Sequence, residues 1–526
     1  MFPTPVGATQ PPPLEKVETR LFINGEFVQA TGAPSYPLHN PVNGSYLLSV
    51  PSASRQDVET AYQAANRAQP GWHSLGAQVW CSLFLKLASL LRENSARLVA
   101  LESMVMGKPS TAADALRTAP MIENLAGQAI VNHGESSITT SGQMGVSLLV
   151  PYGVTAAIVP WNTPILLTLA KLAPALLAGN TMIVKPSERS PLSVIMLAKL
   201  FQEAGFPPGV FNIVNGGEEV GTMLSTHPGI RKIAFTGSVE TGKKVARASA
   251  ESNLKNLVLE LGGKNPAVIF DDADLEQAVS ATEFSLVYNA GQVCMANSRI
   301  LVQQGIADRF IEAFVQKFTA RVPGDPFATG TVIGPLVDRR AYDSVMDYID
   351  EARASGAKVI DARISGAGGS ERRDLGRTLP RQAKRRDGSG FEDGGYFVLP
   401  TVILDLPNDT RAAKEEIFGP VVEIKTFPSS ASGEETLAPE LVDRLNEMAN
   451  SQEYGLYASV FTRSLSTAMK MARLLEAGTV AINQSSPTIL TDMPFGGFKQ
   501  SGWGREFGKE SIERWSLTRT VLFKLD

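Results

Sequence analysis

Cysteine and histidine are scarce in this chain. Its 526 residues include two cysteines, Cys81 and Cys294, and four histidines scattered along the sequence. Two cysteines cannot build a disulfide framework, and the histidines have no ligand spacing. The sequence therefore predicts neither a disulfide-stabilised fold nor a bound metal.

Long hydrophobic runs and an excess of one charge sign are also lacking. A net charge of -4 gives no reason to expect a nucleic acid as partner. Apolar stretches such as 164–178 contain Lys171 and Pro174 and are too short to span a membrane, and the N-terminus has no basic segment followed by an apolar run. We therefore expect a cytoplasmic globular protein of two to four domains that binds neither nucleic acid nor membrane.

Two nucleotide-binding signatures are incomplete. The stretch "NGGEEVG" lacks the full G-x-G-x-x-G pattern, and "GSVETGKK" has Lys244 where a P-loop needs a hydroxyl for magnesium. These differences argue against a P-loop nucleotidase. Ser238 still follows a strand-like run, so the helix that begins there could bind a diphosphate through its backbone amides.

What the sequence does contain, from residue 152 onward, is an alternation of two kinds of segment. Strand-like runs include "TAAIVP", "TMIVKP", "FNIVNG", "KIAFTG", "NLVLEL" and "AVIF", and the first four precede helix-compatible stretches at 164–178, 191–204, 218–226 and 239–251. This order predicts βαβ units and a parallel sheet with helices on both faces. Ligands of such sheets bind at the carboxyl ends of the strands.

The N-terminal third adds a hairpin and helices. Asn24-Gly25 between two apolar runs in 20–30 predicts a two-residue β-turn, and residues 58–68 and 77–103 have helical amphipathic patterns. Cys81 lies in the second of these helices among apolar neighbours. We interpret it as a structural residue.

Three polar residues are ambiguous when taken singly. Cys294, in "NAGQVCMANSR", is a nucleophile or a small buried side chain; Glu260, in "LELGGKNP", is a partner of Lys264 or a general base whose pKa burial would raise. Asn162, in "VPWNTP", lies in a turn or serves as a stiffly held donor to an oxyanion.

Seven islands of sequence occur together in one order: "IVPWN", "IVKPSE", "FTGS", "LELGGKNP", "GQVCMANSR", "EEIFGP" and "PFGGFKQSGWGRE". This set closely resembles the aldehyde dehydrogenase superfamily from about residue 17 to the end. The resemblance implies an α/β fold with a Rossmann-like, doubly wound nucleotide-binding domain (17–131 and 152–263), a second α/β catalytic domain (264–488) and a small β oligomerisation arm (132–151 and 513–526). It also implies a homodimer or homotetramer that oxidises an aldehyde to a carboxylic acid with NAD(P).

The resemblance also implies catalytic roles. Cys294 would attack the aldehyde to give a thiohemiacetal and then a thioester, and Asn162 and the Cys294 amide would form the oxyanion hole. Glu260 would activate the hydrolytic water. Lys171 and Glu506 match a pair that would relay its proton.

The implied cofactor site favours NAD over NADP. Lys185 and Glu188 match positions at the adenosine ribose, where a carboxylate accepts hydrogen bonds from a 2′-hydroxyl but repels a 2′-phosphate. The remaining implied cofactor residues are Trp161, Gly217, Gly237, Ser238, Glu416 and Phe418.

The implied substrate pocket is wide. Thr163 and Ala170 stand where several relatives carry bulky aromatic residues, so we expect a bulky or aromatic aldehyde. The implied pocket residues are Thr163, Leu167, Ala170, Val293, Met295 and Phe495.

Two alternative functions stay open at this point. A CoA-acylating semialdehyde dehydrogenase would need no base for water, so Glu260 argues against it. A non-catalytic structural homologue should lack the nucleophile, the base or the amide, and all three are present. The basic stretch 371–387 is either a solvated insertion or a docking patch.

Overall fold

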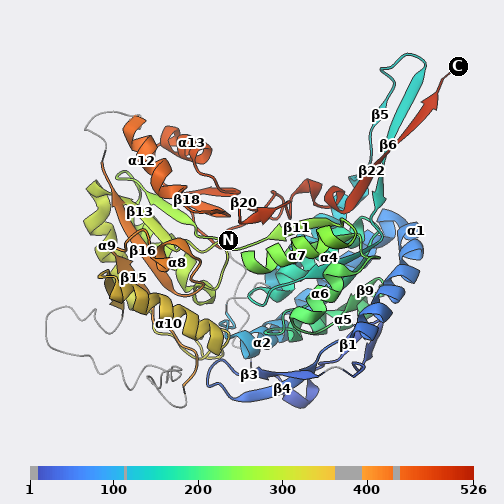
Figure 1. Ribbon diagram of the computed structural model, residues 1–526, viewed down its shortest axis with the longest axis horizontal. Helices are drawn as coiled ribbons and strands as arrows, with labels where there is room; N and C mark the ends of the chain where they lie inside the picture. The colour runs from blue at the N-terminus through green and yellow to red at the C-terminus, as the bar shows by residue number, and fades with distance from the viewer. Residues whose placement is uncertain (1–9, 33, 112–114, 362–393, 430–438, 526) are drawn as a thin grey trace.

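The computed structural model describes residues 10–32, 34–111, 115–361, 394–429 and 439–525. The basic stretch 371–387 and most of a second polar insertion at 428–440 lie outside the described residues. Two lobes stand side by side, and a narrow β arm projects from one of them (Figure 1).

The first lobe is built on an eight-stranded sheet in the order β2-β1-β9-β8-β7-β10-β11-β21. Its centre is parallel and contains five of the predicted strand runs, which confirms the predicted doubly wound sheet. These central strands are β7 (Val154–Ile158), β8 (Thr181–Lys185), β9 (Phe211–Ile213), β10 (Lys232–Thr236) and β11 (Asn256–Glu260). The predicted helices that follow four of them are α4 (Pro164–Leu177), α5 (Leu192–Ala204), α6 (Glu218–Thr226) and α7 (Val239–Ser252).

The edges of this sheet are antiparallel. The predicted hairpin forms from β1 (Leu21–Ile23) and β2 (Glu26–Val28), with Asn24 and Gly25 both at positive φ in the turn. The opposite edge is β21 (Gly502–Trp503), which pairs with the end of β11. A segment from near the C-terminus thus reaches the carboxyl end of the central strands.

The second lobe contains a seven-stranded sheet in the order β14-β15-β16-β13-β12-β18-β19. All its neighbouring pairs are parallel except β14 with β15. The strands are β12 (Pro266–Ile269), β13 (Arg299–Gln303), β14 (Lys358–Asp361), β15 (Thr401–Leu404), β16 (Val421–Phe427), β18 (Tyr457–Phe461) and β19 (Thr479–Ile482). The helices of this lobe are α8 (Leu275–Val287), α9 (Gln304–Thr319), α10 (Arg339–Ala354), α11 (Arg411–Lys414), α12 (Pro439–Ala449) and α13 (Leu465–Leu474).

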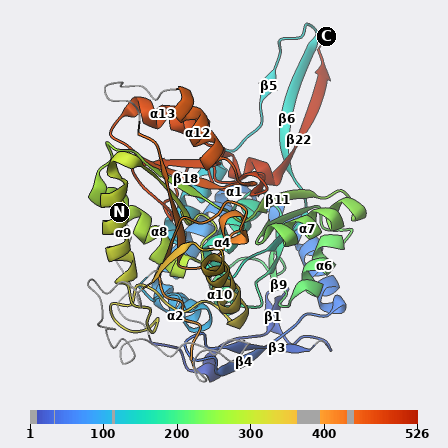
Figure 2. The same ribbon diagram turned by 60° about the vertical axis from the view of Figure 1, so that its left-hand side comes forward.

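The remaining strands form smaller sheets. β22 (Ser516–Lys524) pairs with β6 (Gln143–Pro151) along its whole length, and β5 (Ser136–Ser137) adds a third strand. This sheet is the projecting arm, which stands clear of the body in both views (Figures 1 and 2). The remaining strands are β3 (Ser35–His39) paired with β4 (Tyr46–Pro51), and β17 (Tyr454–Gly455) paired with β20 (Phe498–Lys499).

The N-terminal helices differ from the prediction. α1 (Arg55–Glu93) bends at Gly76, which has a positive φ, and α2 (Ser95–Met106) is separate, so the single helix predicted over 77–103 is wrong. The break falls at Asn94, whose backbone and side-chain N–H groups both donate to the carbonyl of Leu90. α3 (Ala115–Val131) follows.

α1 is also long and apolar enough, by length and composition, to cross a membrane. This indication is weak because the core helices of soluble proteins pass the same test. Trp72, Phe84 and Leu87 of α1 are buried in the core of the first lobe. Cys81 lies on the same helix and packs, partly exposed, against that core.

Candidate active site

The Cys294 loop joins α8 to β13 and is tightly folded. Asn289, Ala290 and Gly291 all have positive φ, and a Cβ on Gly291 would lie 2.2 Å from the carbonyl oxygen of Gly419. Only glycine fits there, because L side chains rarely adopt this conformation and the space is already filled. The backbone of this loop thus fixes the position of Cys294, which is a partly exposed residue.

Gln292 fixes this loop from within. Its side-chain amide donates to the carbonyl of Asn289 at 3.0 Å and accepts from the backbone N–H of Val337 at 3.0 Å. The carbonyl of Gln292 accepts a hydrogen bond from Asn162 Nδ2 at 3.0 Å. Asn162 is buried just past the end of β7, so the structure brings the predicted oxyanion donor against the Cys294 loop. An amide nitrogen carries two hydrogens, and this bond uses one of them.

The surroundings of Cys294 favour the protonated thiol over the thiolate. Burial, together with the negative charges of Glu416 and Glu260, raises the pKa of Cys294 to about 12. Since the thiolate is the nucleophile, the proton must leave before or during attack.

Glu260 ends β11 and is only 3% exposed. Neither of its carboxylate oxygens has a hydrogen-bond partner among the described residues. Burial and the negative charge of Glu506 raise the pKa of Glu260 well above its usual value. The alternative pairing with Lys264 is wrong, because Lys264 Nζ instead donates to the carbonyl of Ala412 at 2.7 Å.

Lys171 and Glu506 form a buried ion pair of 2.7 Å, with side chains 1% and 5% exposed. Both act on Glu260: Glu506 raises its pKa, and Lys171 partly offsets that rise. The structure therefore brings the three predicted relay residues together, although they come from α4, β11 and the C-terminal segment.

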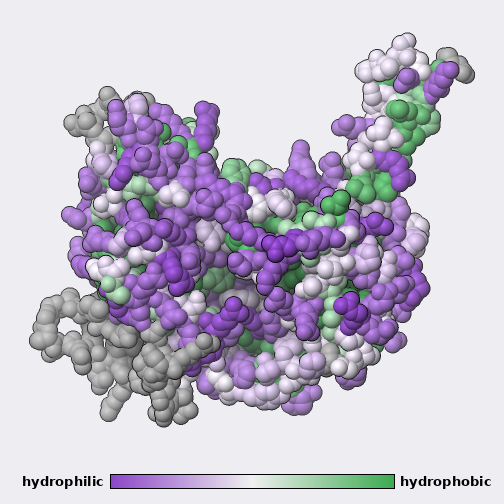
Figure 3. All heavy atoms as spheres, in the orientation of Figure 1, coloured by the Kyte–Doolittle hydropathy of each residue, from purple (hydrophilic) through white to green (hydrophobic). Residues whose placement is uncertain are grey.

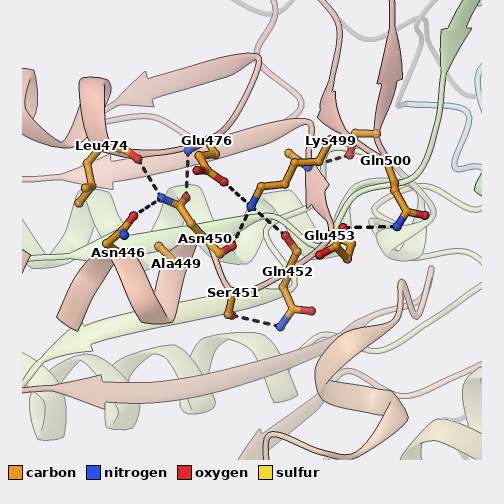
Figure 4. A network of polar contacts seen from close by, with 12 residues as sticks. Asn446, Ala449, Asn450, Ser451, Gln452, Glu453, Leu474, Glu476, Lys499 and Gln500 are labelled. Atoms are coloured by element: carbon orange, nitrogen blue, oxygen red, sulfur yellow. Dashed lines mark hydrogen bonds and ion pairs between the residues drawn. The ribbon is translucent and has the colours of Figure 1, made fainter. Parts of the chain in front are cut away.

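A polar network outside the predicted set secures the segment that carries Glu506 (Figure 4). Lys499 Nζ donates to the carbonyls of Asn450 at 2.7 Å and Gln452 at 3.0 Å, and it pairs with Glu476. The next residue, Gln500, accepts from Lys243 Nζ on α7 at 3.0 Å. The segment that contains β20 and β21 is thus tied to both lobes, and β21 pairs with the end of β11 at Glu260.

A cleft of ≈ 650 Å³ opens at the carboxyl ends of β7, β8 and β10. This volume lies within the usual range of ligand pockets. The rings of Trp161 and Phe418 meet edge to face with centroids 5.6 Å apart. All eight predicted cofactor residues line the cleft: Trp161, Lys185, Glu188, Gly217, Gly237, Ser238, Glu416 and Phe418.

One end of the cleft is formed by Lys185 and Glu188. Lys185 is buried, its Nζ lies 3.5 Å from Glu188 Oε2, and burial lowers its pKa although Glu188 opposes this. The Glu188 side chain is 47% exposed. A sugar hydroxyl would therefore find an accessible carboxylate there.

The other end approaches the thiol through Glu416. Its Oε1 accepts from the Gly263 amide at 3.0 Å, and burial raises its pKa to about 7. Between the two ends, Ser238 caps α7 by accepting from the Thr241 amide, and a Cβ on Gly217 would meet nothing within 4 Å. These features suit a dinucleotide, with its diphosphate near the start of α7.

Four of the predicted substrate residues belong to the buried core cluster that Cys294 contacts. These four are Ala170, Val293, Met295 and Phe495. Thr163 is buried and Leu167 partly exposed. The sequence reasoning did not identify Phe284, Phe327 and Ile489, which pack on this cluster. Within the described part of the chain, no group of acidic, histidine and cysteine side chains could hold a metal ion.

The cleft is lined by Glu416, whose charge reaches the Cys294 thiol, and Glu260 is a buried carboxylate near the same thiol. Together these features define a thiol-containing oxidoreductase of the nucleotide-binding α/β class. The model of the aldehyde dehydrogenase family matches residues 27–521. The chain belongs to the aldehyde dehydrogenase family.

Known relatives match over nearly their full length. An aldehyde dehydrogenase of Emericella nidulans is 39% identical, covering 96% of this chain and 95% of the relative, and retinaldehyde dehydrogenase 3 of Homo sapiens is 38% identical, covering 98% and 95%. Among solved structures, PnpE from Pseudomonas sp. WBC-3 is 36% identical, with a TM-score of 0.86 and coverage of 97% and 98%. The indole-3-acetaldehyde dehydrogenase AldA of P. syringae, solved with NAD+ and IAA, is 34% identical, with a TM-score of 0.86 and coverage of 97% of both chains.

Proposed function

We propose that this protein oxidises an aldehyde to a carboxylic acid with NAD, using Cys294 as the nucleophile. The observation that carries the proposal is the hydrogen bond from Asn162 to the carbonyl of Gln292, two residues before Cys294. It places an amide donor against the loop that presents the thiol. Deprotonated Cys294 adds to the aldehyde carbonyl, and the oxyanion that forms is stabilised by Asn162 and the Cys294 amide.

The chemistry that bound NAD supplies is hydride acceptance. Loss of that hydride leaves an acyl thioester on Cys294. Trp161, Phe418 and Glu416 would hold the reactive end of the cofactor beside this sulfur, and Lys185, Glu188 and Ser238 would hold the rest.

Glu260 then activates the water that cleaves the thioester. Its raised pKa brings it nearer to neutral pH, which suits a general base. The proton of the water passes to Glu260 and then toward the ion pair of Lys171 and Glu506. The water oxygen adds to the thioester carbonyl, and the carboxylic acid leaves the Cys294 thiolate free for the next aldehyde.

NAD is favoured over NADP by the charge at one end of the cleft. The Glu188 carboxylate would repel a 2′-phosphate, and the nearby Lys185 is already paired with it. Solved relatives add support, since PnpE and indole-3-acetaldehyde dehydrogenase have both been solved with NAD.

A bulky, ring-bearing aldehyde is the proposed substrate class. Thr163 and Ala170 are small, buried side chains, and Ala170 belongs to the core against which Cys294 packs. Two relatives support this substrate class, because they are named for retinaldehyde and indole-3-acetaldehyde, which both carry rings.

A panel of aldehydes, followed by NADH absorbance and run in parallel with NADP, tests the proposal. We expect turnover with NAD, a higher kcat/KM for a substituted benzaldehyde than for acetaldehyde, and no NADH from Cys294→Ser. Wild-type rates from that variant would refute the thiol mechanism, and a strong preference for acetaldehyde would refute the proposed substrate class.

A further inference from the structure

Arg189 is a cation of the cofactor cleft to which the sequence reasoning assigned no role. Four basic residues line the cleft: Lys185, Arg189, Lys244 and Arg340. Two of them are paired with carboxylates of the cleft itself, Lys185 with Glu188 and Lys244 with Glu218 at 2.8 Å. Their charge is therefore already balanced inside the cleft.

Arg189 extends along the cleft. Its backbone directly follows Glu188, which we assign to the adenosine ribose, yet its guanidinium carbon lies 5.7 Å from the ring centroid of Trp161. Trp161 in turn meets Phe418, which we assign to the nicotinamide side. The Arg189 side chain therefore reaches from beside Glu188 to the ring next to Phe418, and the diphosphate of a dinucleotide joins the two riboses that these residues are proposed to hold.

Asp338, a residue of the second lobe that does not line the cleft, orients this guanidinium. Arg189 Nε and Asp338 Oδ2 form an ion pair of 3.0 Å. Asp338 Oδ1 accepts from the Ala341 amide at 2.8 Å as the N-cap of α10, so the carboxylate is itself held in place.

This pairing leaves part of the guanidinium available. Asp338 approaches the guanidinium at Nε, which leaves the two terminal nitrogens to meet another partner. The Arg189 side chain is 23% exposed, so these donors are accessible to a ligand. A planar pair of N–H donors matches two phosphate oxygens.

We propose that Arg189 is the ligand of the dinucleotide diphosphate, held ready for it by Asp338 and Trp161. This inference rests on the proposed function, since it assigns one residue to the cofactor of that reaction. It makes Arg189 a binding residue that joins the two lobes across the cofactor.

Isothermal titration of Arg189→Ala with NAD, ADP-ribose and adenosine tests the proposal. Loss of a charge-assisted contact should weaken NAD and ADP-ribose about 10- to 100-fold and leave adenosine, which has no phosphate, unchanged. Arg189→Lys should bind NAD with intermediate affinity, because lysine keeps the positive charge but lacks the planar pair of N–H donors. Arg339→Ala is the matched control: Arg339 pairs with Asp343 at 2.9 Å and does not line the cleft.

The variant Asp338→Asn tests whether Arg189 binds the diphosphate or only makes a structural contact between the two lobes. We expect it to weaken NAD less than Arg189→Ala does, and to have no further effect when both changes are combined. If Arg189→Ala binds NAD and ADP-ribose as tightly as the wild type does, the inference is overturned. It is also overturned if Arg189→Ala loses as much affinity for adenosine as it loses for NAD. Failure of the wild type to bind NAD at all would instead overturn the proposed function.

Discussion

At the scale of the single residue, the meaning of Cys294 depends on what surrounds it. The sequence alone left it either a nucleophile or a small buried side chain. The structure places Asn162 against its loop and Glu416 and Glu260 within electrostatic reach, and Glu416 also lines the cleft. The roles of these residues remain proposals that single substitutions can test.

Asn162→Ala should slow catalysis without weakening cofactor binding. Removing one oxyanion donor typically costs about 2.7–4 kcal/mol of barrier, or roughly 100- to 1000-fold in kcat. Steady-state kinetics would show this fall in kcat, and titration with NAD would show an unchanged Kd. A kcat within a few-fold of wild type would exclude Asn162 from the oxyanion hole.

Glu416→Gln should stabilise the protein at pH 8 and not at pH 4. The pKa of Glu416 is raised from 4.5 to about 7, so folding favours the neutral form, and the wild type loses stability as pH rises through that window. The amide stays neutral, so the variant should gain about 1–3 kcal/mol at pH 8. Denaturant unfolding at the two pH values measures the difference.

The neighbouring Glu415 supplies the control with the opposite sign. Burial is outweighed there by hydrogen bonds from Tyr348 and Arg411, which lower the pKa of Glu415. Its charged form is therefore stabilised by folding, and Glu415→Gln should lose stability at pH 8. The same sign for both variants would contradict the assigned environments.

At the scale of the element, hydrophobic periodicity predicted the central strands β7 to β11 and the helices between them. It failed where tertiary contacts decide the structure. β21 has only two residues, Gly502 and Trp503, so it carries no periodic signal and exists because it pairs with β11. The break at Asn94 was missed because apolar residues continue on both sides of it.

The segment that contains β20 and β21 should depend on Lys499. Lys499→Ala removes donors to two carbonyls and the pair with Glu476, and we expect a loss of about 1–3 kcal/mol in the free energy of unfolding. Since this segment leads to Glu506, kcat should fall while the Kd for NAD stays constant. Lys470→Ala, at an exposed position of α13, is the control and should change neither. Unchanged stability and kcat in Lys499→Ala would exclude a positioning role.

At the scale of the whole molecule, the order of seven short motifs predicted the family, the fold and the set of residues around the cleft. Contacts between the lobes were not predictable in the same way. Arg189 and Asp338 belong to no shared motif, and the partners of Lys499, which are Asn450, Gln452 and Glu476, lie outside the motif that contains it. These contacts join segments that are far apart in the sequence. The domain boundaries and the role of the arm stay predictions.

The arm should hold subunits together. Hydrophobic side chains gather along it (Figure 3), and Leu148, Leu522 and Phe523 are 46%, 70% and 47% exposed. An exposed apolar sheet edge of this kind favours pairing with another chain. Light scattering after size exclusion should therefore give a multiple of 56.3 kDa for the wild type and a smaller mass for a Leu522→Glu, Phe523→Glu variant. A monomeric wild type would refute the proposed oligomer.

The central claim is that an acyl thioester forms on Cys294 and waits for Glu260. Mass spectrometry of Glu260→Gln, mixed with NAD and an aldehyde and digested after acid quenching, tests it most directly. Because the chain has only two cysteines, Cys81 serves as an internal control. The account predicts the mass of the acyl group on the peptide that contains Cys294 and none on Cys81. Steady turnover of this variant with an unmodified Cys294 peptide would contradict it.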